Sequence, residues 1–351
     1  MSISAEPLLK AMQNVYGHFP DKHLAESWTP PPAVGGHRGR YLWTDAFGVV
    51  NLISLSKLTF DSVYITLASR LIETVHDVLG RTRDGLQRLP CATDSEPLKG
   101  GLRIGKVDEL GPDGDGQYFH YLTVWMFALN RMSKATGERG YNELAVQLAK
   151  AVHPRFMVNR DAARPRMYWK MSEDLSRPLV RSEGNLDPID GYVVYSLLQS
   201  AAGEPVLQSK IAEYKKILET KWRNYGSSDP LDLGMTLWTS HWFVHDPQEE
   251  WARGLTQRAF RDLWNVKASG YFDAPLAMRL AFRELGTSLG TRCHPIDSDF
   301  EELAHSITST WESAISEDYD DEDDLGPITC VMYVAAAFPG AFGRGFLGHE
   351  D

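Results

Sequence analysis

The feature that most constrains this chain is a repeated alternation between two kinds of helical segment. Apolar residues recur at helical spacing along the sequence, in segments that are by turns amphipathic and apolar almost all round. A helix that is apolar on every side must be covered on every side, whereas an amphipathic helix shows one face to water. The alternation therefore predicts two concentric layers of helices, an inner buried one and an outer exposed one.

Twelve helices are predicted, and no run of residues alternates in the way that a strand ladder requires. The approximate helix ranges are 5–17, 41–55, 60–79, 117–136, 141–153, 188–202, 205–224, 230–245, 248–266, 274–289, 299–317 and 327–338. Two long connections, at about 81–116 and 154–187, are rich in Gly, Pro and charge. Connections of this length in a compact domain are usually functional or mobile. We expect them to gather at the end where the inner helices begin.

Composition sets the broad class of protein. The chain has 351 residues, of which 43% are hydrophobic, so one large barrel-type domain is within reach. Its formal net charge of −11 argues against partners such as nucleic acid or an anionic membrane, which need clustered Lys and Arg. The odd number and wide spacing of Cys91, Cys293 and Cys330 favour a reducing compartment. With no leader-like or membrane-length apolar run, we expect a soluble, cytoplasmic protein.

Acidic residues mark the starts of several predicted helices. Asp187 and Asp229 each precede a proline and an apolar helix, which is typical of an N-cap followed by Pro at the first helical position. Asp190 and Asp232 follow three residues later, where a capping-box acid would lie. We therefore predict that Asp187 is a cap, and we leave both capping and function open for Asp190 and Asp232.

The layout of the chain is similar to a known architecture. Twelve alternating helices in this length resemble the (α/α)6 barrel of the six-hairpin glycosidase-like superfamily. The segment 41–48, Tyr-Leu-Trp-Thr-Asp-Ala-Phe-Gly, is similar to the Trp-Asp-x-x-Phe pattern of some glucosidase members, with Thr44 between Trp43 and Asp45. The resemblance implies an all-α toroid of six hairpins, a single domain over residues 1–351. It also implies active-site groups at the N-terminal ends of the inner helices, and activities such as glycoside hydrolysis or sugar epimerisation.

Carboxylates at these helix starts are the first catalytic candidates. Glycoside hydrolysis needs one carboxylic acid to protonate the leaving oxygen and one carboxylate to attack carbon or to activate water. The candidates are Asp45, Asp115, Glu183 and Asp190, with Asp232 as a substrate-binding residue. Capping and turn formation are the competing explanations. The first hypothesis is an intracellular glycosidase that acts on a small or modified saccharide.

Histidines support two other hypotheses. Epimerases exchange a proton on carbon through bases that are often His, because the pKa of His lies near neutrality. His120 lies one turn inside the predicted helix 117–136, and it would be the base of a sugar isomerase or epimerase. His241 is a substrate-binding candidate, although a hydrogen-bonded core histidine is the competing explanation. The third hypothesis is a non-catalytic barrel that binds a ligand at the same end, since fold does not imply function.

Aromatic and cationic side chains complete the predicted saccharide site. Aromatic faces suit the apolar faces of sugar rings, and cations would pair with an anionic sugar. The further substrate-binding candidates are Trp43, Tyr118, Tyr168, Trp169, Lys170, Arg181 and Trp238. Core packing and loop solubility are the competing explanations.

Metals and cofactors are not predicted. Cys293, His294 and Cys330 offer thiolates and an imidazole for zinc, but the residues around them form no zinc pattern. No Gly-rich phosphate loop precedes a suitable strand–helix unit, and no nucleophile elbow is present. A small-molecule saccharide is therefore the only predicted partner, and the oligomeric state is left open.

Overall fold

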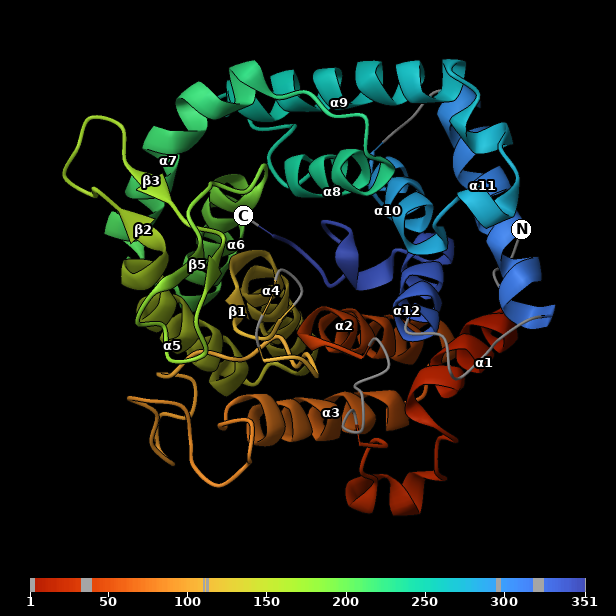
Figure 1. The fold of residues 1–351 in the computed structure, drawn as a ribbon. Helices are drawn as coiled ribbons and strands as arrows, with labels where there is room; N and C mark the ends of the chain where they lie inside the picture. The colour runs from red at the N-terminus through yellow and green to blue at the C-terminus, as the bar shows by residue number, and fades with distance from the viewer. Residues whose placement is uncertain are drawn as a thin grey trace. The chain divides into compact units, whose positions relative to one another are not determined.

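A computed structural model describes residues 4–32, 40–109, 111, 114–294, 298–317 and 325–350 (Figure 1). Residues 110, 112 and 113, within the predicted connection 81–116, lie outside this described part. The chain forms two compact units, Tyr16–Leu218 and Met1–Val15 with Glu219–Glu350, and each is described by itself. The prediction of a single domain over residues 1–351 stays a prediction.

The unit Tyr16–Leu218 is built from helical hairpins. Its α-helices are α2 (Leu42–Thr59), α3 (Val63–Leu79), α4 (Phe119–Thr136), α5 (Arg139–Phe156), α6 (Asp187–Ala202) and most of α7 (Gln208–Lys221), preceded by the 3-10 helix η1 (Lys22–Ser27). α4 packs against α2, α5 and α6, while α3 packs on α2 (Figure 1). Every residue of α2 from 42 to 55 is buried, as the absence of a polar face on this helix requires.

Short strands occupy the predicted connection 154–187, and one more, β1, takes the first two residues of the helix predicted over 117–136. β1 (Gln117–Tyr118), β4 (Lys170–Met171) and β5 (Pro178–Val180) form an antiparallel sheet in the order β1-β4-β5. β2 (Met157–Val158) pairs with β3 (Arg166–Met167). These strands are two or three residues long, too short to produce a visible alternation of apolar and polar residues.

The second unit is also helical. It contains α1 (Ala5–Tyr16, except its last residue), α8 (Pro230–Ser240), α9 (Glu250–Ala268), α10 (Ala281–Arg292), α11 (Ser298–Glu317) and α12 (Gly326–Ala337), with short 3-10 helices η3 to η6 (Trp222–Asn224, Tyr271–Asp273, Leu276–Met278 and Gly340–Phe342). α10 packs against α8, α11 and α12, and α9 packs on α8. None of the helices in the described residues combines the length and apolarity that crossing a bilayer demands.

Each predicted helix corresponds to an observed α-helix, with differences at the ends. The helix predicted over 274–289 begins only at Ala281, because the preceding segment is anchored as a loop. Arg279 in that loop makes two hydrogen bonds, of 2.7 and 2.5 Å, to the wholly buried carboxylate of Glu284. The helix predicted over 230–245 ends earlier, at Ser240.

The helix starts correct one prediction and confirm another. Asp187 is not the N-cap of α6, because the helix begins at Asp187 itself and Leu186 holds the cap position. With Leu186 as the N-cap, the capping-box position is Ile189, one residue before Asp190. The Asp190 side chain bonds to His120 instead. Asp229 is a cap as predicted, and its Oδ1 accepts hydrogen bonds from the backbone N–H groups of Leu231 (2.8 Å) and Asp232 (3.3 Å).

Helices α8 and α10 touch through their backbones. A Cβ atom at Gly234 would overlap the backbone of Gly286 and Thr287, and one at Gly290 would overlap the backbone of Gly234. Glycine is required at these positions because any side chain would push the two helices apart.

We therefore expect Gly234→Ala to destabilise the protein by about 3 kcal/mol or more, because backbone cannot move aside as a side chain can. Chemical denaturation measures the loss. Gly140→Ala on α5 is the matched control, since nothing lies near its Cβ position and Ala favours helix, so stability should change by less than about 1 kcal/mol. A Gly234→Ala protein as stable as the wild type would contradict the close crossing.

A buried histidine joins α5 to α7. His153 is fully buried, and its Nε2 lies 3.1 Å from Oε2 of Glu213, whose carboxylate also accepts two 2.8 Å hydrogen bonds from Arg160. Burial lowers the pKa of His153 from 6.5 to about 4. Hydrogen bonding from Arg160 lowers the pKa of Glu213 from 4.5 to about 2. The fold therefore holds a neutral histidine beside an ionised glutamate.

Stability should consequently fall with acidification. Both folded pKa values lie below the unfolded ones, so the stabilisation is complete above pH 6.5 and is lost towards about pH 4 for His153 and towards about pH 2 for Glu213. Thermal melts from pH 7 to pH 4 measure this loss. In His153→Phe the same pH interval should change the melting temperature less, because the titrating ring is gone. If the melting temperatures of the two proteins fell equally with pH, the assignment of this pH dependence to His153 would be contradicted.

Candidate functional site

The starts of α4 and α6 bring a histidine and an aspartate together. His120 is the second residue of α4 and Asp190 is the fourth residue of α6, and these two helices pack on each other. Nδ1 of His120 lies 2.6 Å from Oδ2 of Asp190. The Asp190 side chain is 1% exposed and that of His120 is 11% exposed. Because Nδ1 bonds to the carboxylate, Nε2 is the ring nitrogen through which a proton can pass to a ligand.

The start of α4 is held by the small sheet of β1, β4 and β5. The backbone N–H of Phe119 donates to the carbonyl oxygen of Trp169 (2.9 Å), next to the β1–β4 pair. Nε2 of Gln117 donates to the carbonyl oxygens of Gly100 (2.8 Å) and Glu173 (2.7 Å). A side chain at residue 101 would collide with the Gln117 amide, so Gly101, at φ 80°, leaves room for this anchor. The connections 81–116 and 154–187 thereby fix the position of His120.

Aromatic rings surround His120. The Trp43 ring centroid lies 4.6 Å from that of His120, and Trp43 also lies 5.4 Å from Tyr121. Tyr118 lies 4.7 Å from Tyr121, 4.8 Å from Trp169 and 6.1 Å from His120. The structure therefore brings together five residues of the predicted site: Trp43, Tyr118, His120, Trp169 and Asp190. Sequence reasoning missed Tyr121, which lies in the first turn of α4, three residues after Tyr118.

Two other carboxylate candidates hold the chain together. Asp45, at the start of α2, is bound by Arg40 (2.8 Å) and by the hydroxyl of Tyr16 (3.1 Å). Burial raises the pKa of Asp45, and Arg40 opposes that shift. These contacts anchor Arg40 and Tyr16 to the first turn of α2.

Asp115 clamps the connection 81–116. Its carboxylate accepts hydrogen bonds from Arg83 (2.8 Å) and Arg103 (2.6 Å), and from the backbone N–H groups of Gly105 (2.9 Å) and Lys106 (3.2 Å). Such a set of donors satisfies a buried carboxylate. The guanidinium groups of Arg83 and Arg103 are thereby paired within the chain.

The remaining candidates of this unit lie on the strands and the loop before α6. Glu183 is half-buried, with Oε1 3.4 Å from the Met167 backbone nitrogen and 4.0 Å from Nε of Arg166. Lys170 is buried on β4 and its Nζ donates to the carbonyl oxygen of Gly114 (2.6 Å). Tyr168 is half-buried and Arg181 is exposed.

The three candidates of the second unit carry structural contacts. Asp232 is half-buried in the first turn of α8 and accepts a 3.1 Å hydrogen bond from the Tyr225 hydroxyl. The indole N–H of the buried Trp238 donates to the carbonyl oxygen of Phe342 (3.1 Å). His241 is buried too, with Nδ1 against the Trp238 carbonyl oxygen and Nε2 accepting from the Arg344 backbone N–H (3.1 Å). The contacts of His241 are those of a hydrogen-bonded core histidine.

Metal ligands do not gather in the described residues, where no group of three His, Cys, Asp or Glu side chains could hold an ion. The cysteines are free thiols, and burial raises the pKa of Cys293 and of Cys330 to about 12. These two sulfurs are therefore protonated near neutral pH.

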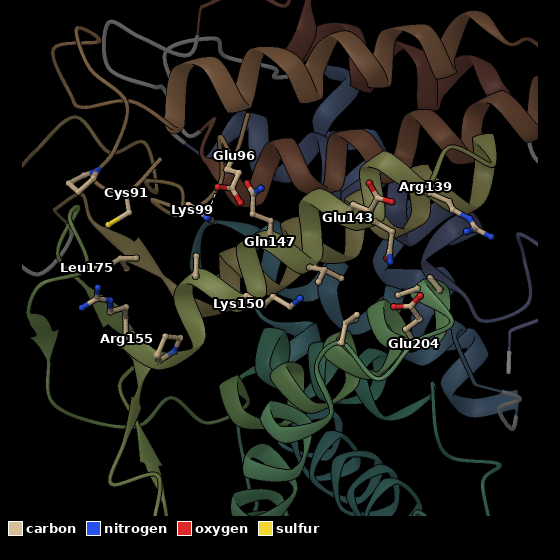
Figure 2. A pocket seen from close by; sticks show the side chains of 18 of the residues that line it. Cys91, Glu96, Lys99, Arg139, Glu143, Gln147, Lys150, Arg155, Leu175 and Glu204 are labelled. Atoms are coloured by element: carbon tan, nitrogen blue, oxygen red, sulfur yellow. Dashed lines mark ion pairs between the residues drawn. The ribbon is translucent and has the colours of Figure 1, made fainter. Parts of the chain in front are cut away.

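A groove of about 660 Å³ runs along α5 (Figure 2). Cys91, the ion pair of Glu96 with Lys99, and Gln147, Lys150 and Arg155 lie around it. No residue of the His120 cluster lines this groove, and none of its lining residues is aromatic. We place the candidate site at His120 and Asp190, because a proton-transfer pair and aromatic rings meet there.

Comparison with known proteins shows the fold. No protein-family model matches the chain, and no curated protein matches its sequence. An α-1,6-mannanase from Salegentibacter has a TM-score of 0.57 at 12% identity, over 95% of this chain and 98% of that one. A cellobiose 2-epimerase from Spirochaeta thermophila has 0.51 at 12%, over 88% and 85%. A sugar epimerase from a ruminal bacterium has 0.55 at 11%, over 93% and 98%.

These neighbours belong to the six-hairpin glycosidase superfamily. The predicted fold class, an all-α (α/α)6 toroid, is therefore confirmed. Identities of 11–12% carry the fold alone, so the choice between hydrolysis and epimerisation must rest on the residues of this chain.

The clamp at Asp115 can be tested through stability. We expect Asp115→Asn to cost about 3 kcal/mol, because it leaves the buried Arg103 and its neighbour Arg83 without a counter-charge. Denaturation and trypsin cleavage within 81–116 both report the loss. Asp94→Asn is the matched control, since Asp94 pairs with Arg88 while 94% exposed, and it should change stability by less than about 0.5 kcal/mol. Equal effects of the two substitutions would refute the clamp.

Proposed function

We propose that this protein is a saccharide-converting enzyme, a sugar isomerase or epimerase, with His120 as its base. The observation that carries the proposal is the 2.6 Å contact between Nδ1 of His120 and the buried carboxylate of Asp190. A carboxylate in this position orients the ring and stabilises the imidazolium that forms when Nε2 takes a proton. The half-buried rings of Tyr118 and Trp169 supply surfaces suited to a sugar.

The reaction follows from what one oriented base can do. An open-chain sugar carries an acidic C–H beside its carbonyl group, and Nε2 would remove that proton to leave an enediolate. Transfer of the hydroxyl proton from one enediolate oxygen to the other, followed by return of the carbon-bound proton to the neighbouring carbon on the same face, gives the isomer. Return to the original carbon on the opposite face gives the epimer, which needs a second donor or a turn of the intermediate. A single histidine base therefore suffices to move the carbon-bound proton in isomerisation, while the substrate's own hydroxyl proton passes between its two oxygens.

A cellobiose 2-epimerase and a sugar epimerase share this fold, so the fold is compatible with the proposal. Within the unit Tyr16–Leu218, two of the four carboxylates considered for hydrolysis, Asp45 and Asp115, are bound by arginines. A carboxylate held in this way is a poor shuttle for protons. The geometry thus favours the histidine mechanism over one that uses two carboxylates.

Glycoside hydrolysis is the second candidate, with Asp190 and Glu183 as its carboxylates. It is favoured by the coverage of the mannanase match, 95% of this chain and 98% of that one. A variant of that mannanase with two adjacent aspartates changed to asparagine is described as inactive, in complex with α-1,6-mannotriose. In this sequence adjacent aspartates occur only at 320–321 and 323–324, outside the described residues. We therefore rank hydrolysis second.

We also propose that the enzyme works inside the cell, in the cytoplasm. The three free cysteines and the acidic composition support a reducing, aqueous compartment.

A sugar screen in D2O tests both candidates. Aldoses, ketoses and reducing disaccharides are followed by NMR for deuterium uptake beside the carbonyl group, and α-1,6-mannotriose is followed for cleavage. We expect deuterium uptake, with kcat lowered at least about 100-fold in His120→Asn and in Asp190→Asn, the scale of a general base. His305→Asn, an exposed histidine on α11, is the control and should be fully active.

Three possible results discriminate between the histidine mechanism, hydrolysis and a different site. Deuterium uptake lost in both variants supports the histidine mechanism. Mannotriose cleavage that depends on Asp190 and Glu183 but not on His120 would replace it with hydrolysis. Conversion that survives both His120→Asn and Asp190→Asn would reject this site altogether.

A further inference from the structure

The unit that contains α9 has a groove that the proposed function does not use. It measures about 480 Å³ and is lined by Trp222, Glu250, Arg253, Gly254, Gln257, Arg258 and Arg261. All of these except Trp222 lie on α9. Each lies three or four residues from another of them along the helix, so they share one helix face. Three arginines thus lie together on a chain whose net charge is −11.

Two of the arginines are held by their neighbours. Arg253 donates to the carbonyl oxygens of Asp246 (2.9 Å) and Pro247 (3.4 Å). Arg261 donates to Oδ1 of Asp262 through two hydrogen bonds, of 3.0 and 2.8 Å. Arg258 lies between them along the helix, and its side chain makes no hydrogen bond or ion pair with another residue in the described part of the chain. Its guanidinium is therefore available for an external anion.

Trp222 is fixed at the side of this cluster. A side chain at position 254 would collide with the indole ring, so Gly254 lets the ring lie directly on α9. The Arg223 guanidinium lies 4.9 Å from the centroid of the same ring. An aromatic surface is thus held beside a preformed group of guanidinium donors.

We propose that this groove binds a phosphorylated sugar. The phosphate would pair with Arg258, assisted by Arg253, because the planar guanidinium fork matches phosphate oxygens bidentately. The sugar would lie against Trp222, with Gln257 and Glu250 within the same groove for its hydroxyl groups. The volume lies in the range of small-molecule sites, about 300–1,000 Å³.

The charge balance separates this groove from the one along α5. The α5 groove is lined by four cationic and four anionic side chains and by no aromatic ring (Figure 2). The α9 groove has three arginines against the single carboxylate of Glu250, and Asp262 beside it is already bound by Arg261. A phosphate group joined to a sugar ring therefore fits the α9 groove better than the α5 groove.

The test measures binding rather than turnover, so it stands apart from the proposed activity. Isothermal titration and tryptophan fluorescence are followed with glucose 6-phosphate, inorganic phosphate and glucose, up to about 10 mM, where a millimolar site is nearly filled. We expect saturable binding of glucose 6-phosphate, at least about tenfold weaker binding of inorganic phosphate, and no glucose binding that depends on Arg258, since charge-assisted pairing and ring contact act together.

Variants locate the site. Arg258→Gln should weaken glucose 6-phosphate binding at least about tenfold, as expected for loss of a charged hydrogen bond, and Trp222→Leu should reduce it to the level of phosphate. Arg155→Gln, which removes a charge from the α5 groove, and His120→Asn should leave binding unchanged. Circular dichroism and melting temperature confirm that each variant is folded.

Two outcomes would overturn the proposal. One is the absence of saturable binding by either phosphate ligand to the wild-type protein. The other is binding that a folded Arg258→Gln protein retains in full. If inorganic phosphate and glucose 6-phosphate bound equally well, the proposed contact between the sugar and Trp222 would be wrong.

Discussion

Three helices of the unit Tyr16–Leu218, α2, α4 and α6, lack a face that suits water, and their neighbours must cover them on every side. Burial of α4 against α2, α5 and α6 fixes where its first turn lies. That first turn carries His120, and the facing turn of α6 carries Asp190. The placement of the His120–Asp190 pair thus depends on how α2, α4 and α6 pack on one another.

The long connections serve the same end by different means. Asp115 gathers two arginines and two backbone N–H groups, and Gln117 bonds two carbonyl oxygens, so that loops rich in Gly and Pro acquire fixed positions. Carboxylates in a sugar-active fold are natural candidates for catalysis. At Asp45 and Asp115, however, the surrounding donors indicate anchoring, whereas at Asp190 the partner is a base that can itself exchange a proton.

Sequence reasoning found the helices because each spans several turns, and a periodicity of 3.6 residues is visible over that length. It missed the strands β1 to β5, which are too short to show a period, and it misassigned Asp187 because a residue before proline was read as a cap. It selected His120, Asp190, Trp43, Tyr118 and Trp169 as site candidates. It could not pair His120 with Asp190, since 70 residues separate them in the chain.

The sequence by itself determined the helical class, the order of the hairpins and the residue types available for chemistry, because these follow from local periodicity and composition. Only the tertiary structure decided which acids are occupied by arginines and which one faces a histidine. The distance between two side chains from different hairpins is set by how the helices pack and how their connecting loops are anchored. No local pattern in the sequence encodes that distance.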